Sequence, residues 1–541
     1  MTSVNSMLAA LDTRDARPGV MWTTGNVAEA FPGVFTALGL SFGFAPMEMA
    51  FRRMFHDLGV YSTAELAVPC EAEDCFWSVF NGRGAGNIDK FREIANRMPG
   101  TTASAVEQQL FGFVRPETVN ENTYRRYPFI FCRAPRWLIL TPRRHDAMFA
   151  TLRRWRLQQL PRVNTLDEQG CLAVLADARA RFEDIMSLHM GVAMISSSLA
   201  EKVAETARKA GNDGLEAALL SGVGSDENEV AHDLWELAHE RITFREFTSR
   251  HGYHGPNEGQ LSGVTWREDP APVIARLADY RAIGPDSPRT PRARSAAQAR
   301  IRDDALKQLL SDIPKTKRAM VRSLVRLTAR YLALREQGKS GYLLTYDVAR
   351  AAARRIGAIL VERGVMDDVE DVFHLDYEAL ATGIQADQRV TIAERKARHR
   401  RQQQLRLPKS WSGLPQSISS TEMSQSHLAA GDTLTGVAAS GGVVTGRARV
   451  VRDPDEIDLD EGDILVCETT DPAWVPLFLV AGGVVTDHGG LLSHGPIVAR
   501  ELGIPCVCGT ESGSRQIRDG DVVTVDGNLG TVRVVSVSPL G

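Results

Sequence analysis

Residues 486–505 read Thr-Asp-His-Gly-Gly-Leu-Leu-Ser-His-Gly-Pro-Ile-Val-Ala-Arg-Glu-Leu-Gly-Ile-Pro and form the most informative pattern of the chain. Two glycines follow a β-rich run, and a helix-forming segment comes after them. Ser493 is a favourable helix N-cap, and Pro496 falls in the first turn, where its missing N–H costs little. Gly503, two residues before a proline, is typical of a helix end. The stretch predicts a strand, a glycine turn and a helix that begins at His494.

The position of His494 at a helix start suits a particular chemistry. A helix N-terminus presents free N–H groups and a partial positive charge, and both stabilise a phosphate held on the imidazole ring. The same positive end disfavours imidazolium, so the ring stays neutral and nucleophilic near pH 7. Gly489 and Gly490 leave space for the approach of a phosphate donor. These residues predict covalent catalysis by a phosphorylated His494, and we expect His488, before the glycine turn, to be its neighbour.

The rest of the chain divides into three parts by its composition and its hydrophobic pattern. Residues 1–405 are predicted to form a mainly α-helical domain, because apolar residues recur at spacings of three and four over much of residues 145–402. Residues 406–432 are polar and lack apolar periodicity, which predicts a flexible linker. Residues 433–541 carry short β-rich runs and one clear helix, which predicts a small α/β domain. We therefore expect an α+β multi-domain fold.

Two details of the helical region can be predicted. Pro314 is expected to separate two helices, because proline breaks the interior of a helix. A further helix is expected from about Tyr346 to Arg363, with Gly364 beyond its end.

Composition narrows the function classes. The chain has 541 residues, of which 43% are hydrophobic and 24% charged, and its formal net charge is −4. These values are ordinary for a soluble protein and do not indicate binding to nucleic acid or to an anionic membrane. No segment reads as a signal peptide or a transmembrane helix, the seven cysteines lack zinc-like spacing, and no GxxxxGK[ST] loop occurs. We expect a reduced, cytoplasmic protein without a bound metal.

The segment around His494 resembles the phosphohistidine motif of the phosphoenolpyruvate-utilising enzymes, in which Thr, two Gly and Ser-His precede Ile-x-Ala-Arg-Glu-x-Gly-Ile-Pro. Four further segments are similar to parts of the same domain: residues 436–446, 469–472, 519–521 and 526–527. One departure is Gly495-Pro496, where relatives usually have Ala at the second position. The resemblance implies that residues 433–541 form a β/β/α swivelling domain that carries its phosphate on His494.

The resemblance also implies which residues bind the phosphate. They are the small or hydrogen-bonding residues of the motif, together with its arginine: Gly489, Gly490, Ser493, Thr486 and Arg500.

The first two thirds of the chain resemble the middle, substrate-binding domain of rifampicin phosphotransferase and similar multi-domain phosphotransferases. Residues 22–33 look like the start of that domain, and residues 249–258 resemble its glycine-rich loop that ends in glutamate. The resemblance implies a set of substrate-binding residues: Trp22, Asn26, Glu29 and Glu336. Two alternatives stay open, since Trp22 can simply pack in a core and Glu336 can form a structural ion pair with Arg335.

Within the glycine-rich loop, His254 and Glu258 lie four residues apart. They can act as a base and its orienting carboxylate toward a substrate hydroxyl. They can equally fix the loop by hydrogen bonds, and the residues alone do not choose between these interpretations.

The resemblance implies an ATP-dependent, kinase-like phosphotransferase. His494 would take up a phosphoryl group and pass it to the hydroxyl of a small alcohol or phenol, with or without later elimination of phosphate. No ATP-grasp pattern is visible, so we expect a separate ATP-grasp protein, which uses ATP and Mg²⁺, to load His494, and we expect no cofactor on this chain. The alternative is a non-catalytic small-molecule binding or regulatory module in which His494 is silent.

Overall fold

The computed structural model describes residues 16–25, 27, 31–111, 114–115, 118–212, 214–223, 226–384, 386–416, 418–419, 427–451, 459–470, 474–490 and 493–538. The described residues fall into two compact units. Unit 1 draws on Met1–Gly191, Gly259–Gly263 and Gly338–Met423, and unit 2 on Val192–Glu258, Val264–Gln337 and Ser424–Gly541. These bounds differ from the predicted domain over residues 1–405, because residues 192–258 and 264–337 group with the C-terminal segment in unit 2.

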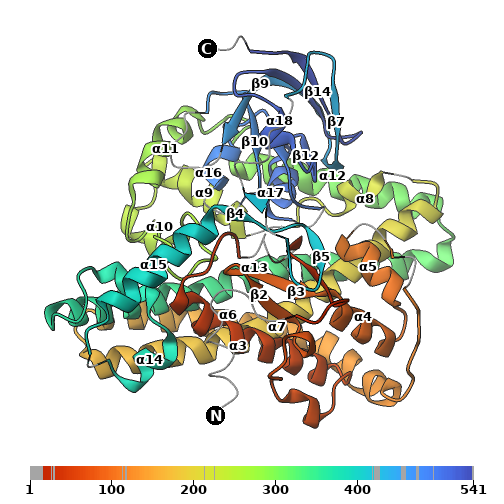
Figure 1. Ribbon diagram of the computed structural model, residues 1–541. Coiled ribbons are helices and arrows are strands. Elements are labelled where there is room, and N and C mark those ends of the chain that lie inside the picture. The colour runs from red at the N-terminus through yellow and green to blue at the C-terminus, as the bar shows by residue number, and fades with distance from the viewer. Residues whose placement is uncertain are drawn as a thin grey trace. The chain divides into compact units, whose positions relative to one another are not determined.

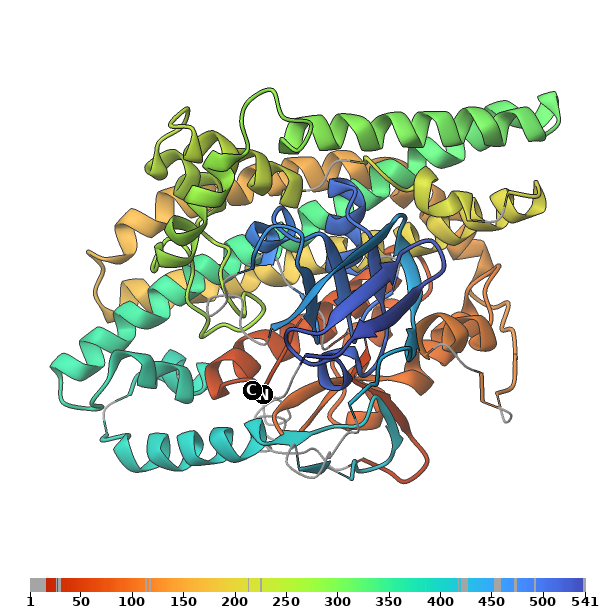
Figure 2. The same ribbon diagram turned by 90° about the horizontal axis from the view of Figure 1, so that it is seen from above.

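Helices dominate the chain outside its C-terminal segment, as Figures 1 and 2 show. The helices of unit 1 are α3 (Ala37–Asp57), α4 (Ile88–Arg97), α5 (Ala103–Phe111), α6 (Tyr127–Val163), α14 (Tyr377–Thr382) and α15 (Arg389–Gln403), with 3-10 turns at Thr63–Leu66, Ala72–Asp74 and Val369–His374. Those of unit 2 are α8 (Leu215–Leu219), α9 (Asp226–Ala238), α10 (Phe244–His251), α11 (Ala271–Ala282), α12 (Pro291–Asp312), α16 (Val475–Phe478), α17 (His494–Leu502) and α18 (Gly513–Gln516). The long helices α7 (Glu168–Lys209) and α13 (Lys315–Glu362) contribute residues to both units.

The predicted break at Pro314 is confirmed, because α12 ends at Asp312 and α13 begins at Lys315. The prediction that a separate helix begins at about Tyr346 is wrong. The apolar face expected there belongs to α13, which continues without interruption from the preceding helical pattern.

A small antiparallel sheet lies in unit 1. Among the described residues it has the strand order β2 (Trp77–Phe80), β3 (Arg83–Asn87), β1 (Met21–Thr23) and β5 (Ser410–Ser412). Strand β5 pairs with β1 in the register Trp22 to Trp411, and a short ladder joins β4 (Leu405–Arg406) to β6 (Ile418–Ser419). The first part of the predicted linker 406–432 is therefore built into the fold of unit 1, because Trp411 is buried there. Residues 420–426 of that linker lie outside the described residues.

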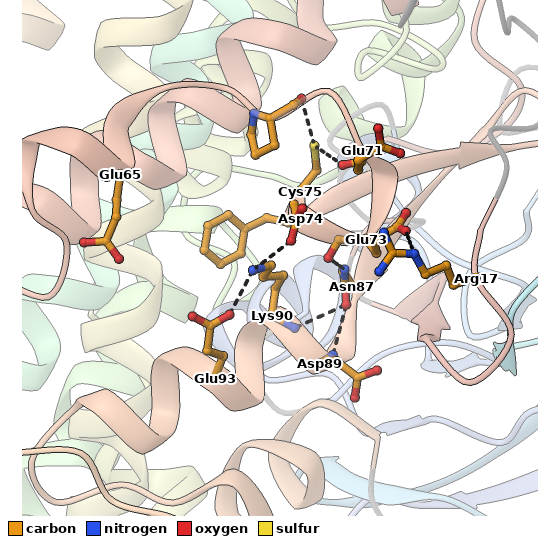
Figure 3. Close-up of polar contacts among 12 residues, drawn as sticks. Arg17, Glu65, Glu71, Glu73, Asp74, Cys75, Asn87, Asp89, Lys90 and Glu93 are labelled. Carbon is orange, nitrogen blue, oxygen red and sulfur yellow. Dashed lines mark hydrogen bonds and ion pairs between the residues drawn. The ribbon is translucent and has the colours of Figure 1, made fainter.

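The junction between β3 and α4 shows how the sheet is tied to its neighbours (Figure 3). Asn87 ends β3 and caps α4, since its side-chain oxygen accepts the N–H groups of Asp89 at 3.1 Å and Lys90 at 3.2 Å. Its amide nitrogen donates to the carbonyl of Glu73 at 2.9 Å. The ammonium of Lys90 lies 2.9 Å from the carboxylate of Glu93. One buried asparagine thus joins strand, helix and loop.

A mixed sheet forms the C-terminal part of unit 2. Its described strands follow the order β7 (Thr433–Thr435), β14 (Thr531–Ser536), β13 (Val522–Asp526), β9 (Val443–Val451), β10 (Ile464–Cys467), β11 (Gly483–Thr486), β12 (Cys506–Cys508) and β8 (Val437–Ser440). Strands β9, β10, β11 and β12 run parallel, and the outer pairs are antiparallel. This sheet with its helices confirms the predicted fold class, a helical chain followed by a small α/β domain.

The two faces of this sheet bury different cores. One core consists of strand residues such as Val466, Val485 and Val523. The other reaches beyond the sheet, because Phe478 of α16 and Val498 of α17 belong to the same cluster as apolar side chains of α9, α10 and α11. The sheet domain and the helices of residues 226–283 therefore share one hydrophobic core within unit 2.

No helix in the described ranges is long and apolar enough to cross a membrane. Among the same residues, no group of three or more His, Cys, Asp or Glu side chains is placed to hold a metal ion.

A buried ion pair inside unit 1 supports a prediction about stability. Arg156 of α6 and Asp347 of α13 lie 2.7 Å apart, with their side chains 2% and 0% exposed. We expect Asp347→Ala to lower the free energy of unfolding by about 3–5 kcal/mol, because it leaves a buried guanidinium without its counter-charge. The control is Asp367→Ala, which removes an ion pair with Arg389 of the same 2.7 Å length whose side chains are 72% and 41% exposed. That change is expected to cost less than about 1 kcal/mol. Equal shifts of the two variants in urea unfolding would contradict the expectation.

Candidate functional site

His494 is the first residue of α17, as predicted. The residue as a whole is half-buried, its Nε2 atom is buried, and its Nδ1 atom lies 3.1 Å from the hydroxyl oxygen of Thr470. The ring of Phe478 meets it edge-on, with ring centroids 6.3 Å apart. The helix ends at Gly503, which adopts the left-handed conformation expected of a glycine in that position.

Thr470 can approach His494 because the residue that follows His494 is Gly495, which has no side chain. A Cβ atom on Gly495 would lie only 2.7 Å from the Thr470 hydroxyl oxygen. Gly495 therefore has a steric reason to be present, independent of the proline that follows it.

The glycine turn before α17 differs in one respect from the prediction. Ser493 occupies the N-cap position with extended backbone, but its hydroxyl makes no capping bond to the described helix residues. Instead the Ser493 hydroxyl oxygen accepts the N–H of Gly490 at 2.7 Å, and the Ser493 N–H donates to the Gly490 carbonyl at 3.0 Å. Ser493 thus closes the turn and leaves the N–H groups of the first helical turn to other acceptors.

The two glycines of the turn have different surroundings. Gly489 has φ +124°, and a Cβ there would meet the Ser493 hydroxyl at 3.0 Å. Among the described residues outside its chain neighbours, Gly490 has no atom within 4 Å of the position that a Cβ would take. The approach of a phosphate donor from this side stays a prediction.

The predicted phosphate ligands Thr486 and Arg500 are both engaged elsewhere. Thr486 is buried, and its hydroxyl donates to the carbonyl of His488 at 2.9 Å, so it fixes the turn. Arg500 lies six residues beyond His494, about 9 Å along the helix axis at the usual rise. It is 4% exposed, and burial lowers the pKa of its guanidinium.

Asp487 is a residue of the motif whose role the sequence did not reveal. Its buried carboxylate accepts the Ser514 N–H at 2.9 Å and the Thr510 hydroxyl at 3.2 Å, and it also accepts the Ser514 hydroxyl. It therefore anchors the end of β11 to the start of α18. The partners lie more than twenty residues away in sequence, which is why the pattern alone could not pair them.

His488 is more exposed than His494, the residue predicted to carry the phosphate. Its side chain is 43% exposed, and its Nε2 lies 3.5 Å from the carboxylate of Glu468. It stands on the far side of the glycine turn from α17, in agreement with its expected place as a neighbour.

The pair His254 and Glu258 forms as the spacing suggested. The His254 Nδ1 lies 2.8 Å from Glu258 Oε2, and the two residues are 1% and 3% exposed. The loop is also held by its backbone, since the Trp266 N–H donates to the His254 carbonyl at 2.7 Å. The geometry suits both interpretations, a base with its orienting carboxylate and a hydrogen bond that fixes the loop.

A second histidine–carboxylate contact lies beside this loop. His251 Nε2 and an Arg250 guanidinium nitrogen each lie 2.9 Å from Asp233 Oδ2. Burial opposes ionisation of Asp233, but the hydrogen bonds from His251 and Arg250 outweigh it and hold the pKa of the carboxyl well below its usual range. Asp233 is therefore an anionic anchor that ties α9 to the end of α10.

The predicted substrate-binding residues do not form one described group. Trp22 is fully buried in unit 1 and packs edge-on against Phe80 at 5.1 Å, which agrees with the alternative that it packs in a core. Asn26 and Glu29 lie outside the described residues. Glu336 is 6% exposed in unit 2, and its carboxylate lies 3.9 Å from Arg335 Nε.

Comparison with known proteins adds two matches. Residues 459–530 match the mobile domain of PEP-utilising enzymes, and residues 240–336 match the fourth domain of rifampicin phosphotransferase. The first match contains His494 and its glycine turn, and the second contains His254, Glu258 and Glu336.

Several curated proteins are similar over about half of the chain. Rifampicin phosphotransferase of Streptomyces sviceus is 31% identical over 302 residues, which cover 55% of this chain and 34% of that protein. Its counterpart in Bacillus subtilis is 28% identical over 300 residues, covering 54% and 34%. An uncharacterized protein of Mycobacterium tuberculosis is 34% identical over 288 residues, covering 53% and 30%.

The chain thus spans about a third of the length of the curated relatives it matches. The chain is therefore similar to the phosphoenolpyruvate-utilising enzymes over residues 459–530 and to rifampicin phosphotransferase over residues 240–336.

Proposed function

We propose that this chain is a phosphotransferase component that accepts a phosphoryl group on His494 and transfers it to the hydroxyl of a small alcohol or phenol. The observation that carries the proposal is the place of His494 at the start of α17 with Thr470 beside its Nδ1 atom at 3.1 Å. The relatives named rifampicin phosphotransferase support the reaction class.

The contact with Thr470 can fix which nitrogen of the His494 ring carries the proton. If the Nδ1–H donates to the Thr470 oxygen, the lone pair resides on Nε2, which becomes the nucleophile. Nε2 attacks the phosphorus of the donor, and the bond from phosphorus to the donor's leaving oxygen breaks. The N–H groups at the start of α17 and the positive end of its dipole stabilise the phosphate that results.

In the second step the substrate hydroxyl attacks the phosphorus. The P–N bond breaks, the P–O bond forms, and Nε2 regains its lone pair. We propose that His254 takes the proton of the hydroxyl while Glu258 holds its Nδ1 atom at 2.8 Å. The product is a phosphate ester, which can be the final product or be eliminated to give net dehydration.

The phosphate donor is proposed to come from another protein. An ATP-grasp partner that uses ATP and Mg²⁺ would load His494, and no cofactor is assigned to this chain. The competing proposal is a binding or regulatory module with a silent histidine. The space beside Gly490 and the contact between Thr470 and His494 favour the enzyme, because a silent domain has no chemical use for them.

The first prediction concerns the carrier. With an ATP-grasp loading partner, ATP and Mg²⁺, the chain is expected to take up phosphate in an acid-labile, base-stable form, detected by mass spectrometry under alkaline conditions. His494→Ala is expected to abolish labelling and product formation while costing about 1 kcal/mol or less in stability, because a first-turn residue contributes little to the core. His488→Ala, the matched control, is expected to retain labelling. Phosphate on His488, or transfer by the His494→Ala chain, would overturn the assignment.

A second prediction concerns the ring orientation. Thr470→Val keeps the shape of the side chain but removes the hydroxyl, so the His494 tautomer is no longer fixed. We expect phosphate uptake to fall by about tenfold, as is usual when a neighbour that orients a histidine is lost, and the ring ¹⁵N shifts of His494 to change in the free protein. Thr445→Val is the control, because that hydroxyl pairs with Thr524 on an exposed strand. Unchanged ¹⁵N shifts in Thr470→Val would show that the hydroxyl does not orient the ring.

The third prediction tests whether the domain that carries His494 moves between two sites. A carrier that travels between two sites needs a linker of sufficient length. Deletion of residues 420–426 is expected to slow turnover without weakening substrate binding, and replacement of the same residues by a Gly/Ser stretch of equal length is expected to leave both unchanged. Wild-type turnover after the deletion would contradict the swivelling model.

A further inference from the structure

Unit 1 contains a pocket lined by aromatic rings. Helix α3, strand β2 and Tyr346 of α13 form its walls, and Phe31 and Phe35 lie on the approach to α3. The pocket holds about 400 Å³ of space when the part open to solvent is counted. The centre of a water-sized molecule can move within only about 30 Å³ of it, so any ligand held there is small.

Glycines create much of this space. Gly39 and Gly43 lie one turn apart on α3 and both face the pocket. A Cβ on Gly43 would come within 3.2 Å of the Tyr346 hydroxyl, and a Cβ on Gly84 of β3 within 3.1 Å of Val27. Ordinary side chains at these positions would reduce the pocket.

The rings around the pocket support one another. Phe31 lies 6.4 Å from Trp77 and 6.1 Å from Phe35, measured between ring centroids. On the other side, Tyr346 is held edge-on by Phe42 at 5.8 Å. Rings that are braced in this way offer a preformed apolar surface to a flat molecule.

One polar atom of the pocket lining lacks a partner. Trp77 Nε1 is buried and has no hydrogen-bond partner among the described residues, whereas the Ser78 side chain points to the opposite face of β2. Buried donors almost always find a partner, and an unsatisfied one destabilises the fold. The described lining includes no Asp, Glu, Lys, Arg or His. Burial also raises the pKa of Tyr346, so its hydroxyl remains a neutral donor.

We propose that this pocket binds a small, uncharged aromatic molecule that carries one hydroxyl or carbonyl oxygen. The ring packs among Phe31, Trp77 and Tyr346, and the oxygen supplies the acceptor that the Trp77 N–H lacks. A carboxylate on the same ring is excluded, because no cation lines the pocket to offset its desolvation. This binding goes beyond the proposed phosphotransferase and does not depend on it, because the described pocket lining includes none of His494, His254 and Glu258.

The test is a calorimetric titration of the full chain with phenol, without ATP or a loading partner. Saturable binding at one site per chain is expected, with benzoate binding at least about tenfold more weakly. Absence of phenol binding, or equal binding of benzoate, would overturn the proposal.

Substitutions of residues that line the pocket test where phenol binds. Trp77→Phe removes the donor and is expected to weaken phenol binding by about three- to tenfold, whereas Ser78→Ala, on the opposite face of β2, is expected to leave it unchanged. Gly43→Ala narrows the pocket and is expected to weaken binding by a similar factor, while the helix tolerates alanine better than glycine. Gly284→Ala in unit 2 is the control, since a Cβ there meets nothing within 4 Å, and it is expected to bind phenol as the unaltered chain does. Wild-type affinity in both Trp77→Phe and Gly43→Ala would overturn the proposal.

The outcomes separate the two proposals. Phenol binding that responds to the pocket variants, together with a His494 that never takes up phosphate, would support the pocket and refute the phosphotransferase. Phosphate uptake on His494 without phenol binding would support the carrier and refute the pocket.

Discussion

The parallel pairing of β10 with β11 is the constraint on which the candidate site depends. Parallel neighbours end at the same edge of a sheet, so the segment after β10 meets the segment after β11. The first segment supplies Thr470 and the second leads through the glycine turn to His494, which places a hydroxyl beside an imidazole 24 positions later in the chain. The absence of a Cβ at Gly495 lets that contact close. Asp487 then fixes the same strand end from the other side.

The packing of the sheet domain within unit 2 bears on how the carrier can move. Apolar side chains of α16 and α17 share a core with those of α9. The carboxylate of Glu501 accepts the Val223 N–H at 3.0 Å and the Asn228 amide at 2.8 Å, next to this core. A domain that leaves this position must expose apolar surface and break both hydrogen bonds. The described arrangement is thus a docked one, and swivelling requires another surface that compensates for this loss.

Unit 1 is organised by aromatic packing and by buried charges that are paired. Glu48 is fully buried, and burial raises the pKa of its carboxyl, although Arg52 at 2.8 Å and the Phe76 N–H oppose the shift. This carboxylate links α3 to the start of β2, the two elements that flank the ring-lined pocket.

The sequence alone determined the features that rest on local physics. A strand, two glycines, a cap-forming serine and a terminal glycine fix the start of α17 at His494 and its end at Gly503, and Pro314 fixes the break between α12 and α13, because each depends only on neighbouring residues. The motif also carried the resemblance that the matched family bears out. Tertiary structure decided everything that requires distant segments to meet. The hydroxyl of Ser493 closes the turn instead of capping the helix, Arg500 is buried, and Trp411 of the expected linker pairs into a sheet. These outcomes follow from which groups compete for the same hydrogen bond or the same apolar space, and that competition exists only once the chain has folded.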